Sequence, residues 1–199
     1  MFLFYNYCIF AVQKYYCTMI TARQKRKENI FEYLIYMWQV EDLIRACGFD
    51  ADEIEKRVIS QYTQPEDIKR EIRQWYSELI DMMHGESVTE KGHIRININV
   101  MEELAELHLQ LLKSPQETVY GALYYKALPA IVQLRSKSGG SDVSEIETCF
   151  TAVYGYLLLK MQGKEVSNNT TESIKQISSL LTFLAGRFHE EENPIKVKS

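Results

Sequence analysis

The sequence predicts an all-α fold, a single-domain bundle of six or seven helices, and three observations lead to that prediction. Apolar residues recur at three- and four-residue spacing along most of the chain, which is the period of an α-helix. The 199 residues include only nine Gly and four Pro, too few turn-forming residues for an all-β sandwich. An apolar fraction of 46%, with 12% aromatic residues, is ample for a hydrophobic core.

The first 18 residues differ in character from the rest of the chain. They are rich in aromatic residues and hold one charge, Lys14, and no basic residue precedes their apolar run as it would in a secretory signal. Three interpretations stay open: a spurious or disordered extension before a true start at Met19, an interfacial anchor, or a docked aromatic helix. The abrupt change at Met19 favours the first. The helical domain is therefore expected over residues 19–192, followed by a tail over 193–199.

The first three helices are predicted from apolar stripes and their end signals. A basic run, Arg23–Lys27, leads into a helix over residues 30–46 that is apolar on nearly every side and is therefore expected to be central. Gly48 ends this helix. A short second helix is expected from Asp50 to about residue 60, with acidic residues in its first turn. A third, amphipathic helix follows Pro65.

The remaining helices are predicted from capping residues and polar loops. Residues 94–99 alternate in polarity without a partner strand, so they are expected to be an extended segment that leads into a fourth helix at 97–113. Ser114, Pro115 and Glu117 predict the start of a fifth helix, which continues to about residue 136 with a kink at Pro129. After the linker at 138–142, helices are expected at 143–162 and 172–190. The first and fifth helices are predicted to be the most buried.

Glu41 is the most unusual residue of the first predicted helix. It projects near the middle of an apolar face, where an unpaired carboxylate is too costly to bury. Arg45 follows four positions later, at the spacing that a Glu–Arg pair prefers. Glu41 is therefore expected to be paired, protonated or functional.

Two further polar residues project onto apolar helix faces. His108 does so on the fourth helix, and Lys126 does so on the fifth, among tyrosines. The favoured interpretations are a hydrogen-bonded core histidine and a snorkelling or salt-bridged lysine. The alternative is one polar pocket between the first, fourth and fifth helices, whose predicted residues are Trp38, Glu41, Arg45, His108, Tyr124 and Lys126.

Known chemical signatures are missing from the sequence. There is no P-loop, dinucleotide-binding, zinc-protease or nucleophile-elbow motif, and the four cysteines form no CxxC pair, so no catalytic residue, metal or cofactor is predicted. The formal charge of −4 gives no overall field for nucleic acid, which leaves Arg23–Lys27 as a third-ranked nucleic-acid hypothesis. No membrane segment is predicted, and reduced thiols suit a cytoplasmic protein.

The leading functional hypothesis is a non-enzymatic cytosolic binding or scaffold module, with a protein partner or a second copy of the chain. The alternative is a small-ligand-binding protein or enzyme that uses the pocket around Glu41. The stretch RQKRKENI…YMWQVEDLIRA, over residues 23–46, resembles the opening of an uncharacterised all-helical family of unknown function from Bacteroidetes. The similarity extends from Met19 to about the seventh helix. It implies a cytosolic bacterial protein that begins near Met19, and it assigns no activity or catalytic residue.

Overall fold

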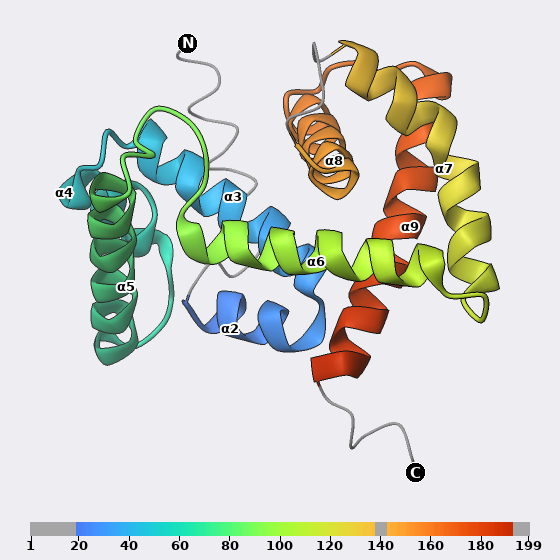
Figure 1. Ribbon diagram of the computed structural model, residues 1–199. Helices are drawn as coiled ribbons and strands as arrows, with labels where there is room; N and C mark the ends of the chain where they lie inside the picture. The colour runs from blue at the N-terminus through green and yellow to red at the C-terminus, as the bar shows by residue number, and fades with distance from the viewer. Residues whose placement is uncertain (1–18, 138–142, 193–199) are drawn as a thin grey trace. The chain divides into compact units, whose positions relative to one another are not determined.

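A computed structural model describes residues 19–137 and 143–192, and within these ranges the chain forms helices joined by turns and loops, without a single strand (Figure 1). The all-α prediction is therefore confirmed for the described part of the chain. The predictions for residues 1–18, for the linker at 138–142 and for the tail at 193–199 lie outside the described residues. The α-helices and one short 3-10 helix have these bounds: α2 Met19–Glu28, α3 Ile30–Ala46, α4 Ala51–Arg57, η1 Ile59–Gln61, α5 Glu66–Gly85, α6 Arg95–Lys113, α7 Thr118–Lys137, α8 Glu145–Met161 and α9 Asn168–Glu192.

The described ranges hold eight α-helices, so the predicted count of six or seven is slightly low. The basic run belongs to a separate helix, α2, because the helical conformation is interrupted at Asn29, before α3 begins. The side-chain oxygen of Asn29 accepts a hydrogen bond from the backbone N–H of Phe31, at 3.0 Å. This is the interaction by which Asn starts a new helix.

The chain divides into two compact units. The first contains residues up to Glu28 together with Glu32–Ile98, and the second contains Asn29–Phe31 together with the chain from Asn99 onward. Helix α6 therefore begins in the first unit and continues in the second. The expectation of one domain over residues 19–192 stays a prediction.

In the first unit, α4 and α5 are held by local polar contacts over a buried apolar face. Asp50 caps α4 by accepting hydrogen bonds from the backbone N–H groups of Asp52 and Glu53. Arg73 of α5 forms ion pairs with Glu55 at 2.7 Å and with Glu66 at 2.6 Å. The buried side of α5 shows the predicted helical spacing and consists of Ile72, Tyr76, Leu79, Ile80 and Met83.

In the second unit, α7, α8 and α9 lie side by side (Figure 1). Ser144 caps α8 by accepting a hydrogen bond from the Glu147 backbone N–H, at 3.0 Å. An ion pair between Arg187 of α9 and Glu117, at 2.9 Å, ties the end of α9 to the start of α7. The buried stripe of α9 consists of Ile174, Ile177, Leu180, Leu181, Leu184, Ala185 and Phe188.

Three predicted helix starts are wrong. Residues 95–99 are the first residues of α6 rather than an extended segment, because the carboxylates of Glu41 and Glu86 bind the backbone N–H groups at its start. Helix α7 begins at Thr118, since Ser114 closes a turn by accepting a hydrogen bond from the Glu117 N–H, at 3.2 Å. Helix α9 begins at Asn168, where the Ser167 hydroxyl caps it, four residues before the predicted start.

The prediction that α7 is one of the two most buried helices is also wrong. Most of α3 is buried, as expected, but α7 buries only Tyr120, Ala127, Ala130 and Ile131. The remaining apolar side chains of α7 are half-buried or exposed. Apolar composition alone therefore predicted the burial of α3 correctly and that of α7 incorrectly.

Candidate functional site

Glu41 is completely buried, and both of its carboxylate oxygens have partners in the first unit. Oε1 accepts a hydrogen bond from the Asn97 side-chain amide at 2.8 Å and another from the backbone N–H of Ile94 at 3.2 Å. Oε2 lies 2.5 Å from Nδ1 of His93. We refer to Trp38, Glu41, His93, Ile94 and Asn97 as the Glu41 cluster. The carboxylate is thus satisfied by the start of α6, whose free N–H groups favour a negative charge.

The residues that bind the Glu41 carboxylate have further partners of their own. The His93 ring stacks on Trp38, with ring centroids 4.1 Å apart and an interplanar angle of 8°, and its side chain is 29% exposed. Asn97 is buried, and its side-chain oxygen accepts a hydrogen bond from the Tyr33 hydroxyl at 3.2 Å. Burial raises the pKa of that Tyr33 hydroxyl, so it remains a proton donor at neutral pH.

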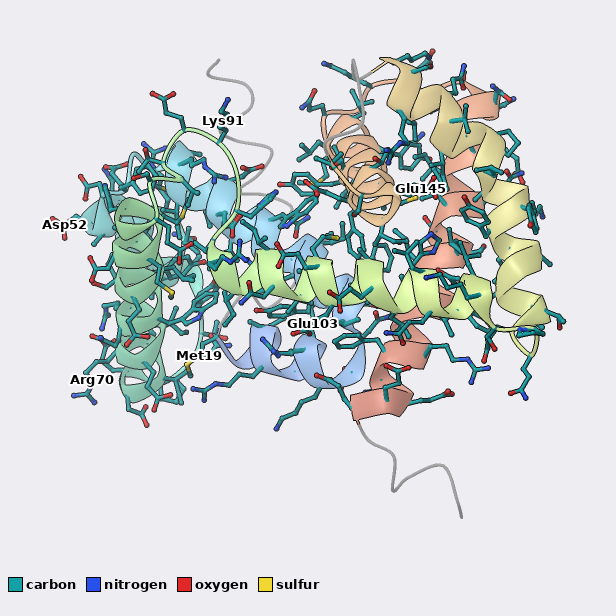
Figure 2. The ribbon with its side chains drawn as sticks, viewed as in Figure 1. Met19, Asp52, Arg70, Lys91, Glu103 and Glu145 are labelled. Carbon is teal, nitrogen blue, oxygen red and sulfur yellow. The ribbon has the colours of Figure 1, made fainter. Side chains whose placement is uncertain are left out.

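Arg45 does not form the predicted pair with Glu41. Its guanidinium bonds to Asp42 at 2.9 Å and donates to the backbone carbonyls of Val88 at 3.0 Å and Gly92 at 2.5 Å. These carbonyls belong to the connection between α5 and α6, where Figure 2 labels Lys91. Glu86, at the start of the same connection, accepts a hydrogen bond from the Arg95 backbone N–H. Glu41 and Arg45 therefore hold this connection and the first turn of α6 in place.

A second polar cluster lies in the second unit, around His108. Nδ1 of this buried histidine lies 2.6 Å from the Tyr120 hydroxyl. Nε2 is 3.7 Å from a carboxylate oxygen of Glu145, the first residue of α8 (labelled in Figure 2), and has no hydrogen-bond partner among the described residues. That oxygen accepts a hydrogen bond from the Tyr124 hydroxyl at 2.9 Å. The cluster connects α6, α7 and α8.

The pKa shifts in this second cluster follow from burial. Burial lowers the pKa of His108, and the Glu145 carboxylate opposes that shift. Burial raises the pKa of Tyr124 to about 12, with the hydrogen bond to Glu145 contributing in the same direction. Burial likewise raises the pKa of the Cys149 thiol to about 12. A neutral imidazole and protonated hydroxyl and thiol groups are the expected state at neutral pH, which suits a structural network better than an activated nucleophile.

The six residues predicted to line one pocket are divided between the two units. Trp38, Glu41 and Arg45 belong to the first unit, and His108, Tyr124 and Lys126 belong to the second. Lys126, which was expected to snorkel or to form a salt bridge, is exposed on α7. The single pocket stays a prediction, and each set has the partners described above within its own unit. Among the described residues, no three metal-ligating side chains gather to hold a metal ion.

The basic run of α2 is partly engaged by α3. Lys25 forms an ion pair with Glu32 at 2.6 Å, and the Arg26 guanidinium lies 5.5 Å from the centroid of the Tyr33 ring. Two of the four basic residues proposed for nucleic-acid contact therefore have partners within the first unit.

An exposed apolar surface on α7 is the largest departure from the predicted burial. Tyr125 is 72% exposed and Val132 is 57% exposed, and Ala122 and Pro129 are exposed between and beside them. We call these four residues the α7 seam, because their spacing of three, four and three residues places them on one side of the helix. Val119, 59% exposed, lies next to the seam. Contiguous exposed apolar surface of this kind is typical of interaction sites.

Sequence reasoning missed the partners that matter most in both clusters. Neither His93 nor Asn97 was predicted to be a partner of Glu41, yet both bind it. Tyr120 and Glu145, the partners of His108, were not singled out. The one available signal was that a buried acid requires donors, and it does not specify which donors among residues more than fifty positions away.

The chain belongs to a family described as a domain of unknown function (DUF4924), whose model matches residues 19–194. Neither the comparison with curated proteins nor the comparison with solved structures gave a match. Within the described ranges, every helix is too short or too polar to cross a bilayer.

Proposed function

For this member of a family of unknown function, we propose a non-enzymatic, cytosolic bacterial docking module that binds an amphipathic helix of another protein on the α7 seam. The observation that supports this most directly is the exposure of Tyr125 and Val132 on a helix without a single acidic residue. Large apolar side chains on a monomer's surface lose their contact with water when a partner covers them. Tyrosine is also one of the residues that contribute most to binding at interfaces.

The spacing of the seam favours a helical partner. Residues at alternating three- and four-residue spacing form a straight stripe against which a second helix packs with its own apolar stripe. Gly121 borders this stripe, and a Cβ atom added to it would meet nothing within 4 Å. Glycine inside a helix costs roughly 0.5–1 kcal/mol relative to alanine, and none of the described residues packs against this position in a way that requires the missing side chain. A closely crossing partner helix would use that space.

The charges on α7 favour another protein over a second copy of this chain. The helix contains Lys126, Arg135 and Lys137 and no Asp or Glu. Two copies paired through a twofold axis would bring the same surface against itself. The charged residues that the two α7 helices bring to the contact would then all be cations, and their repulsion weakens association.

A labelled helical peptide tests this proposal. The probe is a synthetic four-heptad helix with a leucine and alanine seam and Gln at every flanking position, and its binding to the full chain is followed by fluorescence anisotropy. We expect saturable binding that Tyr125→Asp abolishes. Leu109→Asp, which changes an exposed apolar residue of α6, is the matched control and should leave probe binding unchanged.

Two outcomes overturn the proposal. One is probe binding that is absent, or equal in the wild-type chain and in Tyr125→Asp. The other is a concentration-dependent dimer of the wild-type chain in analytical ultracentrifugation that Tyr125→Asp converts to a monomer, because the seam then serves a second copy. Circular dichroism of each variant verifies that the fold is retained.

A ligand or catalytic site at Glu41 has less support. Both carboxylate oxygens are bonded to protein groups, and those groups include the start of a helix that needs an acceptor. A structural role for Glu41 accounts for each of these contacts without a ligand. Glu41→Gln tests this role: loss of stability supports it, and loss of a bound small molecule with full stability would contradict it.

A further inference from the structure

We infer that the helix bound by the α7 seam carries two carboxylates on one side of its apolar stripe, about eleven residues apart, opposite Lys126 and Lys137. This inference rests on the proposed function and specifies the chemistry of its partner. It follows from where the cations of α7 lie and from the lack of a carboxylate beside two of them among the described residues.

Lys126 and Lys137 lie on the same side of the seam. They are eleven positions apart, which is about three helical turns and therefore places both side chains along one border of the apolar stripe. Their separation along the helix axis is about 16 Å. Both are exposed. The third cation of the helix, Arg135, points to a different partner, because its guanidinium donates to the carbonyl of Val143 at 3.0 Å.

The described part of the second unit supplies no carboxylate to these two lysines. Glu117, which directly precedes α7, is bound by Arg187 at 2.9 Å. Glu145 of α8 accepts a hydrogen bond from the Tyr124 hydroxyl and faces His108. No carboxylate of the described residues lies within ion-pair distance of Lys126 or Lys137. The border of the seam is therefore basic, and an acidic border on the partner is electrostatically complementary to it.

Three versions of the probe helix test this inference. They share one seam and carry Glu, Gln or Lys at two flanking positions eleven residues apart. We expect the Glu probe to bind the full chain about tenfold more tightly than the Lys probe at low salt, because two rim ion pairs replace two repulsions. The difference should shrink as the salt concentration rises.

A charge reversal supplies the decisive comparison. Lys126→Glu should reduce or invert the preference for the Glu probe, whereas Lys164→Glu, an exposed lysine between α8 and α9, should leave it unchanged. Equal binding of the three probes, or a preference that Lys126→Glu does not alter, overturns the inference. If all three probes bind the wild-type chain equally and none binds Tyr125→Asp, the docking proposal survives and only the acidic partner is wrong. If no probe binds, the docking proposal itself fails.

Discussion

Helices α3 and α7 have similar apolar character and different surroundings. Both are apolar around nearly their whole circumference, yet α3 is buried along most of its length and α7 leaves Tyr125 and Val132 exposed. Helix α3 carries a buried acid, Glu41, whose oxygens are bonded to a distant segment of the same chain. Helix α7 carries Lys126 at the border of its exposed seam, without a carboxylate of the described residues beside it.

The difference in burial between α3 and α7 suggests that one hydrophobic helix stabilises the fold and the other is available for binding. A polar residue on the buried helix is matched by donors within the chain, and this fixes the position of its neighbours. Lys126, at the border of the exposed helix, has no carboxylate partner among the described residues, and the apolar surface beside it is the one that we propose a partner protein covers. Substitutions on α3 should therefore change stability, and substitutions on the α7 seam should change binding.

Glu41→Ala should produce the largest effect. The change leaves the Asn97 amide, the Ile94 N–H and the His93 ring without their buried acceptor, and removal of one partner from a buried charged pair typically costs about 3–5 kcal/mol. Urea denaturation measures the free energy of unfolding. Glu32→Ala, which breaks the more exposed pair with Lys25, is the control and should cost less than about 1 kcal/mol. Similar losses for both variants would mean that the buried bonds of Glu41 stabilise the fold no more than an exposed ion pair does.

Acidification should produce the next largest effect, through His108 in the second unit. Burial lowers the pKa of His108 in the folded protein, while an unfolded histidine titrates near pH 6.5. The unfolded chain therefore binds the proton more readily, and this contribution to stability is present above about pH 6.5 and is lost as the pH falls from there towards the folded pKa. Unfolding free energies at a series of pH values should show a shallower decrease for His108→Gln. Parallel curves for the two proteins would contradict a buried neutral His108.

Gly121→Ala should have the smallest effect on stability and the opposite sign. The added methyl group meets no atom within 4 Å, so the helix should gain up to about 1 kcal/mol. If a partner helix crosses at this point, the same substitution should weaken binding of the Gln probe although the protein is more stable. Gly163→Ala is the control, because Gly163 has φ +67° and alanine there should destabilise. A Gly121→Ala variant that is less stable than wild type would mean that α7 is already covered at this position.

Much of the helical framework could be predicted from the sequence. Helix α3 matches the predicted range of residues 30–46, because its apolar period and Gly48 are local signals. The start of α6 could not be predicted, since its first N–H groups bind Glu41 and Glu86 rather than the local Asn97 or Asn99. The break at Asn29 was missed because the basic run of α2 continues smoothly into the apolar residues of α3.

The candidate sites were only partly predictable for the same reason. A helical projection shows that Glu41 lies on an apolar face. Local spacing suggested Arg45 as its partner, but Arg45 binds Asp42 and two distant carbonyls instead. His108 was correctly expected to be a hydrogen-bonded core histidine. The exposure of Lys126 and Tyr125 depends on which side of α7 the second unit covers, and periodicity does not contain that information.

The bonds of Glu41 to residues 52, 53 and 56 positions later have a consequence for the order in which the chain folds. The Arg95 N–H at the start of α6 bonds to the nearby Glu86, but Ile94 and Asn97 gain the Glu41 carboxylate only after a loop of more than fifty residues has closed. Closing such a loop costs entropy before any contact is gained, and non-local contacts of this kind slow folding. During synthesis, α3 emerges long before residues 93–97 and must wait, with its carboxylate in water, for the segment that completes it.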